Sequence, residues 1–180
     1  MPDRDTELRA QFEEYVAARR QALLRTAYLL TGQHADAEDL VQLALVKAMP
    51  HWAKIAHDPE PYVRKVLARE SVSRWRGRRW REVTSDRLPE REQVGADQTD
   101  RAAVRTALLA LAPRQRAVVV LRYFDDLTEV QTAQALGIAV GTVKSQSRDA
   151  MTRLRGLLEV DPVKVPTSGA AHGVGEGETP

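Results

Sequence analysis

The stretch Thr128–Arg155 reads TEVQTAQALGIAVGTVKSQSRDAMTRLR and predicts two helices joined by a tight turn. Thr128 can cap the first helix, and Gln131, three residues later, can reach back to it in a capping box. Gly137 suits the left-handed turn that ends this helix. A second helix is expected from about Val140. Together these features predict a helix-turn-helix.

The second helix of this pair separates apolar from polar side chains. Val143, Ala150 and Leu154 share the face that is expected to pack inward. The outward face carries polar and basic side chains: Thr142, Lys144, Ser145, Gln146 and Arg148. In a major groove, amides and guanidinium groups can read base edges, while lysines and hydroxyls can hold phosphates. A solvated helical hairpin is the alternative, and DNA binding is the favoured interpretation.

The composition is that of a folded protein without an export or membrane signal. The chain has 180 residues, 43% of them hydrophobic, and a formal net charge of +2. Its N-terminus is polar, and no apolar run approaches the ~18 residues of a membrane span. The absence of cysteine excludes disulfides, thiolate nucleophiles and cysteine-ligated zinc. We therefore predict a cytoplasmic protein.

Helical periodicity dominates the chain up to residue 81 and resumes after residue 101. The segment between has six acids and three bases over Glu82–Arg101 and no apolar periodicity, which predicts a flexible acidic linker. Beyond about Val160 the chain is rich in Gly, Pro and Thr and is expected to be disordered. The prediction is an all-α fold of two small helical domains, at 1–81 and 102–158, with a linker at 82–101 and a tail at 159–180.

A strongly basic segment closes the first domain. Arg64–Arg81 contains eight basic residues and one acid, Glu70. Trp75 and Trp80 lie among the arginines, so cations could hold phosphates while the indole rings stack on unpaired bases. The alternative is a solvated basic helix whose tryptophans close the hydrophobic core, and for at least one tryptophan this alternative is favoured.

Three acids, Asp36, Glu38 and Asp39, lie in the first turn of a helix expected at 35–52. Acids at this position oppose the helix dipole favourably, which is a sufficient structural reason for them. Exposed acids beside Leu40 and Val41 could also form a docking face for a basic protein surface. The residues alone leave both interpretations open.

Support for an enzyme is weak. Two sets of residues contain groups able to bind a metal or transfer a proton: His34 with Asp36 and Glu38, and His51 with His57 and Asp58. Neither set has an HExxH arrangement, a phosphate-binding glycine loop or a supporting nucleophile. We expect no enzymatic activity, no catalytic residue, no metal, no cofactor and no small-molecule substrate.

Four motifs, taken in order, resemble those of a small sigma factor of bacterial RNA polymerase. They are DAEDLVQ at 36–42, PYVRKVLAR at 61–69, LAPRQRAVVVLRYFDDLT at 111–128 and GTVKSQ at 141–146. More narrowly, the chain resembles the extracytoplasmic-function (ECF) group in its actinobacterial, sigma-E-like branch. The resemblance covers about residues 8–158. It implies a sigma-2 domain at 1–81 and a sigma-4 helix-turn-helix domain at 102–158.

The resemblance also implies a role for individual residues. The clamp helices of the largest polymerase subunit would be contacted by Asp36, Glu38, Asp39, Leu40 and Gln42. The −10 element and its melted strand would be held by Lys54, His57, Asp58, Tyr62, Arg64, Lys65, Arg69, Arg74, Trp75 and Arg76. The −35 element would be contacted by Arg114, Arg116, Thr142, Lys144, Ser145, Gln146 and Arg148.

The implied function is that of an alternative sigma factor, which binds core RNA polymerase, recognises −35 and −10 elements and promotes DNA melting. Its implied partners are the clamp helices, the flap of the second-largest subunit and promoter DNA, with an anti-sigma factor as a further candidate. The alternative is a stand-alone helix-turn-helix regulator, which would favour dimers on paired half-sites. Four residues depart from the family pattern: Arg69 stands where Asn is common, Leu43 where an acid is usual, Ala139 where a Ser often caps the helix, and Asp149 where a basic residue is usual.

Overall fold

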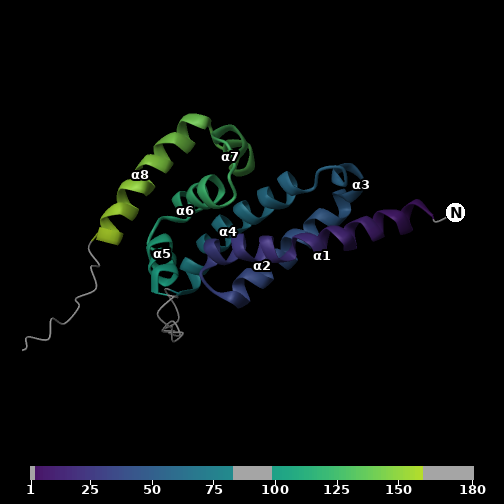
Figure 1. The fold of residues 1–180 in the computed structure, drawn as a ribbon, viewed down its shortest axis with the longest axis horizontal. Coiled ribbons are helices and arrows are strands. Elements are labelled where there is room, and N and C mark those ends of the chain that lie inside the picture. Colours follow the sequence, from purple (N-terminus) through teal and green to yellow (C-terminus); the bar gives the residue numbers. More distant parts are fainter. Residues whose placement is uncertain (1–2, 83–98, 160–180) are drawn as a thin grey trace, which may run out of the picture.

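The computed structural model describes the backbone of residues 3–82 and 99–159 and the side chains of residues 3–74 and 101–158. Within these ranges every element is helical, as the sequence predicts (Figure 1). The predicted linker falls mostly, and the predicted tail almost entirely, outside the described residues. None of the described helices is both long and apolar enough to cross a lipid bilayer.

Two groups of helices make up the molecule. The N-terminal unit contains α1 (Arg4–Thr31), α2 (His34–Ala48), the 3₁₀ turn η1 (Met49–His51), α3 (Trp52–Ile55) and α4 (Glu60–Glu82). The C-terminal unit contains α5 (Thr99–Leu109), α6 (Pro113–Val119), the π-helical turn η3 (Val120–Phe124), α7 (Glu129–Leu136) and α8 (Val140–Glu159). In Figure 1 the start of α1 lies at one end of an elongated molecule and α8 at the other.

The core of the N-terminal unit lies where α1, α2 and α4 meet. Leu23, Leu40 and Leu67 come one from each helix and are almost completely buried there. Burying such a side chain contributes about 1.5–3 kcal/mol relative to leaving it in water. These three helices are therefore held together mainly by their aliphatic faces.

Polar side chains attach the start of α4 to α1. Glu60 accepts hydrogen bonds from Tyr15 Oη at 2.9 Å and from Arg19 Nη2 at 2.7 Å, and Arg64 Nη2 lies 3.3 Å from the same carboxylate. Burial alone would raise the pKa of Glu60, but the hydrogen bonds from Arg19 and Tyr15 and the charge of Arg64 outweigh it and lower that pKa. The cluster sets the position of α4 and of the loop before it.

The helix-turn-helix has the local structure that the sequence predicts. Gln131 N donates to Thr128 Oγ1 at 3.2 Å, and Thr128 N donates to Gln131 Oε1 at 2.8 Å, which completes the capping box. Gly137 ends α7 with a φ of 68°, in the left-handed region. Val143 and Ala150 of α8 are fully buried. Val130, an apolar residue of α7, is exposed.

The two units pack against each other. Ala117 and Val120 of the C-terminal unit belong to the core of the N-terminal unit, and Ala68 of α4 packs with Leu121 and Ala135. Gly32, at the end of α1, allows a close approach, since a Cβ atom there would lie 2.5 Å from Leu109 Cδ1. The sequence predicted two helical units, and the structure adds that they share apolar surface.

Candidate nucleic-acid interface

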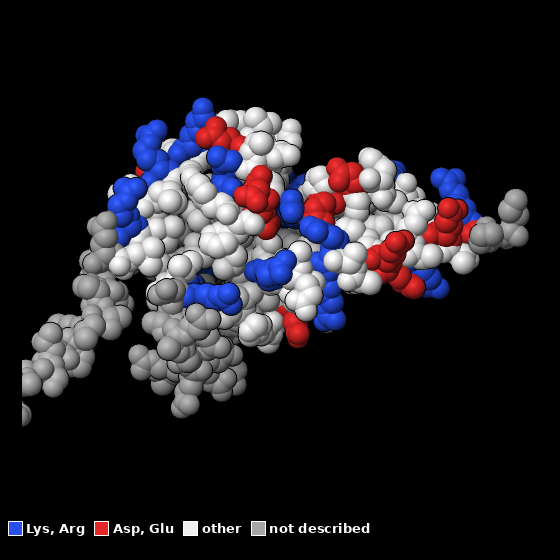
Figure 2. All heavy atoms as spheres, viewed as in Figure 1, with Lys and Arg blue, Asp and Glu red and all other residues white. Residues whose placement is uncertain are grey.

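The solvent side of α8 carries the side chains predicted to reach the −35 element. Lys144, Ser145 and Arg148 are exposed, and Thr142 and Gln146 are half-buried. Buried Val143 and Ala150 hold the opposite side of the helix against the rest of the unit. Figure 2 shows lysine and arginine side chains gathered at the end of the molecule formed by α8. The arrangement presents a polar and basic helix face to solvent.

Two acids lie close to this face. Glu129 Oε2, at the start of α7, is 3.7 Å from Lys144 Nζ. Lys144 is exposed and Glu129 is partly exposed, so solvent screens this ion pair and its contribution to stability is small. Asp149 is exposed on α8 as well, beside Arg148. Lys144 can therefore exchange Glu129 for a phosphate at little cost.

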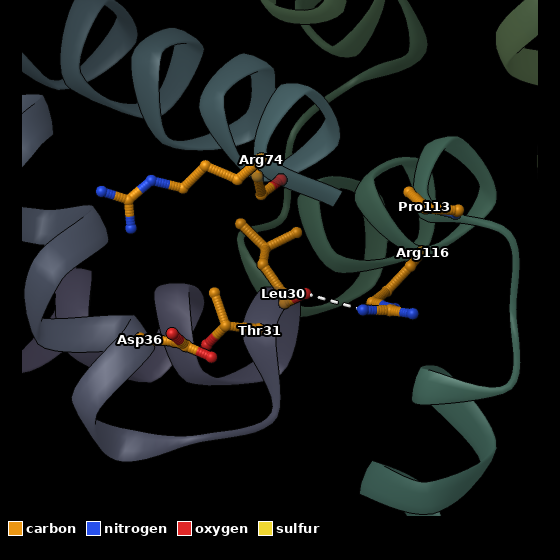
Figure 3. Close-up of a pocket in the computed structure, with 7 residues that line it drawn as sticks. Leu30, Thr31, Asp36, Arg74, Pro113 and Arg116 are labelled. Atoms are coloured by element: carbon orange, nitrogen blue, oxygen red, sulfur yellow. Dashed lines mark hydrogen bonds between the residues drawn. The ribbon is translucent and has the colours of Figure 1, made fainter. Parts of the chain in front are cut away.

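Arg116 does not lie on a DNA-facing surface. It is 7% exposed, and each guanidinium nitrogen donates to a backbone carbonyl oxygen. Nη1 donates to Leu30 at 2.9 Å (Figure 3), Nε to Leu108 at 2.9 Å, and Nη2 to Leu109 and Leu111. These oxygens include carbonyls freed at the end of α5, where a cation also opposes the helix dipole favourably. We therefore correct the expectation that Arg116 holds DNA phosphate. Arg114, two residues earlier, is exposed.

Part of the predicted −10 set gathers around the loop that connects α3 to α4. Lys54, His57 and Asp58 are exposed on it or next to it. The preceding turn is fixed by Trp52, which is buried and meets the Phe12 ring edge-on with centroids 4.9 Å apart. Tyr62 begins the far side of the loop, and Lys65 Nζ lies 5.7 Å from the centre of its ring. Cations and an aromatic face thus adjoin one another at this end of α4.

Other members of the −10 set face the C-terminal unit. Arg64 Nε lies 3.6 Å from Asp125 Oδ2, and Arg69 Nε donates to the Ala135 carbonyl oxygen at 2.8 Å. Arg74 is half-buried and lines a small pocket that also contains Asp36 (Figure 3). The side chains of Trp75 and Arg76 lie outside the described residues. The structure therefore divides the predicted −10 set between the loop and the contact with the C-terminal unit.

The acidic motif of α2 is only partly at the surface. Glu38, Asp39 and Gln42 are exposed, and Asp36 is half-buried. Leu40 is 0% exposed, so the expectation that it touches the polymerase is wrong for this fold: its side chain fills the core between the helices.

Two apolar side chains that the sequence analysis did not place at this surface are exposed instead. Val46 is 63% exposed and Met49 is 57% exposed. Asp39, Gln42 and Val46 of α2 follow one another at spacings of three and four residues, and Met49, the C-cap of α2 and first residue of η1, continues this spacing in helical backbone geometry, which puts the four on one face. The spacing from Asp39 is a sequence signal for this face, but aliphatic side chains of an amphipathic helix are ordinarily buried, so spacing alone does not predict their exposure.

A second apolar surface lies on the C-terminal unit, between α5, η3 and the end of α8. The groove is lined by Val104, Ala107, Leu108, Val119, Tyr123, Phe124, Met151, Leu154 and Leu158. Tyr123, Phe124 and Leu158 are nearly half exposed. A groove with so many exposed apolar side chains is typical of a protein contact site.

Comparison with known proteins agrees with this geometry. Residues 15–81 match the family model of sigma-70 region 2, and residues 101–154 match that of sigma-70 region 4. The chain is 41% identical over 153 residues to an RNA polymerase sigma-E factor of Streptomyces avermitilis, which covers 83% of this chain and 86% of that protein. It is 34% identical over 157 residues to the ECF RNA polymerase sigma factor SigL of Mycobacterium tuberculosis, covering 82% and 86%.

The chain belongs to the ECF group of sigma factors. These relatives act in transcription initiation and are not enzymes. The fold of this sigma factor is similar to that of RpoE from Bartonella quintana, solved in complex with the anti-sigma factor NepR, with a TM-score of 0.66 and 30% identity over 83% of this chain and 98% of that one. It also resembles CnrH, solved with the cytosolic domain of CnrY, with a TM-score of 0.62 and 22% identity over 83% and 88% of the two chains.

The comparisons confirm the fold class and the family predicted from the sequence. We use region 2 for residues 15–81 and region 4 for residues 101–154 from here on. The exposed face of α8 then lies in region 4, and the loop before α4 and the acidic start of α2 lie in region 2.

Proposed function

We propose that this sigma factor acts in the cytoplasm, where it binds core RNA polymerase, recognises −35 and −10 promoter elements and promotes melting of the DNA. The observation that carries the proposal is the exposed polar and basic face of α8, held on a capped helix-turn-helix in a chain that also contains region 2. We propose the domain limits 1–81 and 102–158, with a linker at 82–101 and a tail at 159–180.

In this proposal α8 lies in the major groove of the −35 element. The Gln146 amide suits a base edge, and Lys144 and Ser145 suit phosphate oxygens. Thr142, Arg148 and Arg114 complete the contact. Region 4 alone has few such groups, so its binding to DNA is expected to be weak. Attachment of both regions to one polymerase raises the effective concentration of each at the promoter.

Region 2 is proposed to hold the melted strand of the −10 element. Extruding a base from the stack costs a few kcal/mol, which contacts to the unpaired strand must offset. Lys54 and Lys65 can neutralise phosphate, and Tyr62 offers a ring for stacking beside His57 and Asp58. This work is conformational, since the protein makes and breaks no covalent bond.

The polymerase contact is proposed to use the α2 stripe, defined as Asp39, Gln42, Val46 and Met49. The exposed apolar side chains of the stripe would be buried against the polymerase and exclude water from the contact. The acids Glu38 and Asp39 give the surface its negative charge. Asp36 lies at the edge of this surface. A basic and partly apolar surface, as proposed for the clamp helices of the largest subunit, would complement it.

The apolar groove of region 4 is the proposed contact for the flap of the second-largest subunit. It is also a surface that an anti-sigma factor could cover, and the similarity to RpoE in complex with NepR supports a partner of this class. A purified anti-sigma factor that acts on this protein should block its transcription in a reconstituted assay.

The test is transcription in vitro with this protein and core polymerase purified from Streptomyces coelicolor. The template is a fragmented genomic library from the organism that encodes this protein. We expect discrete start sites that are absent with core polymerase alone and that share −35 and −10 elements. Core polymerase with its own sigma-E factor is the positive control. Binding to duplex DNA without polymerase, together with no new start sites, would contradict the proposal and favour a stand-alone regulator.

A further inference from the structure

One acid lies on the face of α8 that is proposed to enter the major groove. Asp149 is exposed, and it follows Ser145 by four residues and Gln146 by three, spacings that bring the three side chains to one side of the helix. Val143 and Ala150, both 0% exposed, hold another side of α8 in the core. Asp149 therefore faces the same surroundings as the side chains proposed to contact the −35 element.

The carboxylate of Asp149 has no partner within the described part of the chain. Neither an ion pair nor a hydrogen bond joins it to any residue of 3–74 or 101–158. Glu129, the other acid close to this face, differs, because its Oε2 lies 3.7 Å from Lys144 Nζ. An ionised carboxylate accepts hydrogen bonds but donates none. When DNA displaces the water around Asp149, the DNA must supply a donor, because an unpaired charge that loses its water is costly.

The groups that DNA presents in the major groove narrow the choice of donor. Phosphate oxygens are negatively charged and repel a carboxylate. Guanine offers two acceptors, and thymine offers an acceptor and a methyl group. Adenine has an amino group, but its N7 acceptor lies beside that group and would repel the second carboxylate oxygen. Cytosine offers its N4 amino group and no acceptor, so it is the base that suits an unpaired carboxylate.

We propose that Asp149 is a specificity-determining residue of region 4, which accepts a hydrogen bond from N4 of a cytosine in the −35 element and rejects the other three bases at that position. Selectivity of this kind comes from repulsion of the wrong bases as well as from attraction to the right one. This role rests on the proposed placement of α8 in the major groove. It adds the identity of one base that the helix reads.

The geometry of α8 also sets where this cytosine lies. Asp149 is three residues beyond Gln146, about 4.5 Å along the helix axis. Successive base pairs of DNA are about 3.4 Å apart. The base contacted by Asp149 therefore lies one or two base pairs from the base contacted by Gln146, and each of these two preferences should respond to substitution of its own residue.

The role of Asp149 can be tested by transcription from a promoter library that is randomised across the −35 element. With core polymerase and the parent protein, we expect the transcripts to favour cytosine on one strand at the position beside the one that Gln146→Ala relaxes. Asp149→Asn keeps the shape of the side chain but can pair with N6 and N7 of adenine. It should lower the preference for cytosine by about fivefold or more and raise that for adenine.

Asp126→Asn is the matched control, because it makes the same chemical change at an exposed acid of region 4 outside α8. Asp126 has a φ of 54°, which asparagine also tolerates. The base preferences of this variant should equal those of the parent protein. Circular dichroism checks that both variants keep their helices.

Modified DNA isolates the hydrogen bond itself. N4-methylcytosine still pairs with guanine through its remaining N–H, and its methyl group replaces the N–H that points into the major groove. Binding of the parent protein with core polymerase should weaken by about fivefold or more when the selected cytosine carries this group. Asp149→Ala should bind modified and unmodified promoters equally. 5-Methylcytosine, which keeps both N4 hydrogens, is the matched DNA control and should leave the binding of the parent protein close to its unmodified value.

Three results would overturn the role of Asp149: no preference for cytosine beside the position that Gln146→Ala relaxes, an unchanged preference in a folded Asp149→Asn variant, or equal losses on N4-methylcytosine for the parent protein and Asp149→Ala. Start sites that share a −35 element, combined with any of these results, would overturn the role of Asp149 alone. A parent protein that gives no start sites at all would overturn the proposed function and this role with it.

Discussion

The helices α4 and α8 have similar sequence patterns but lie in different surroundings in the fold. Both carry basic side chains on a polar face, and both are proposed to contact promoter DNA. In α8 the basic residues Lys144 and Arg148 remain exposed. In α4, Arg64 is half-buried beside Asp125 of region 4, and Arg69, although exposed, donates to the Ala135 carbonyl oxygen of region 4. A basic helix face therefore suits a DNA contact, but it does not show whether another part of the protein already binds its side chains.

The position of each helix in the fold explains the difference. The helix α8 lies at one end of the molecule, with its buried face against region 4 and its other face in solvent (Figure 1). The helix α4 has region 2 on one side and α6 and α7 on the other. The Ala135 carbonyl oxygen and the Asp125 carboxylate of region 4 each meet an arginine of α4. The predictions below test this contrast between occupied and available side chains.

Among the basic side chains that the structure describes, the largest effect is expected from Arg116, which donates through all three guanidinium nitrogens. Arg116→Ala removes the side-chain donor of the Leu30, Leu109 and Leu111 carbonyl groups, leaves the Leu108 carbonyl with Leu111 N alone, and opens a cavity. We expect a loss of about 3 kcal/mol in the free energy of unfolding, measured by urea denaturation. Arg114→Ala, at an exposed arginine of the same helix, is the control and should change it by less than about 0.5 kcal/mol. Equal effects would contradict the distinction between the two.

The next effect concerns the exposed face of α2. Val46→Asp places a charge in the apolar part of the α2 stripe, and the affinity for core polymerase should fall by about tenfold or more, measured by fluorescence anisotropy. Because Val46 is largely exposed, the free energy of unfolding should change little. Leu40→Ala is the contrasting variant: it should cost about 2–5 kcal/mol of stability, since Leu40 is in the core. Normal polymerase affinity in Val46→Asp would remove the stripe from the interface.

A smaller loss of stability should follow when Glu60, which positions α4, loses its charge. Glu60→Gln weakens the contacts with Tyr15 and Arg19, and we expect a loss of about 1 kcal/mol at neutral pH, since the partners are partly exposed. The folded pKa of Glu60 is lowered, so its stabilisation is present above the unfolded pKa of about 4.3 and is lost as the pH falls through the folded value. The parent and the variant should therefore converge in acid. A constant difference across this pH range would show that the charge is not the cause.

The smallest effect is expected from Lys144, an available side chain of α8. Lys144→Ala in the polymerase complex should weaken promoter binding by about 1 kcal/mol or less and reduce the slope of log affinity against log salt by about one. Ser73, an exposed polar residue of α4, supplies the control Ser73→Ala, for which we expect an unchanged slope. If Lys144→Ala also left the slope unchanged, Lys144 would not be at a phosphate.

Local features of the fold were predictable because their causes lie within a few residues of one another. The capping box of Thr128 and Gln131 and the turn at Gly137 depend on hydrogen bonds and backbone angles inside one short segment. The polar face of α8 follows from helical spacing alone. The assignment to sigma factors was likewise carried by short motifs, and the family comparisons confirm it.

Other features depend on partners far away in the sequence. The spacing of α2 did not separate Leu40, which is buried between helices, from Val46, which faces solvent, because both are aliphatic residues of one amphipathic helix. Arg116 was predicted to be exposed, but it is buried against carbonyl groups of Leu30 and of the end of α5. These acceptors come from segments that only the folded chain brings together.

The sequence by itself thus determined the helices, the helix-turn-helix and the family of this protein, because hydrogen bonding and apolar spacing within each segment specify them. Only the tertiary structure decided which charged side chains bind groups of the other region. Arg69 illustrates the reason: its acceptors, the carbonyl oxygens of Gln134 and Ala135, exist as unpaired groups only at the end of a folded α7, and they reach Arg69 only when the two regions pack together.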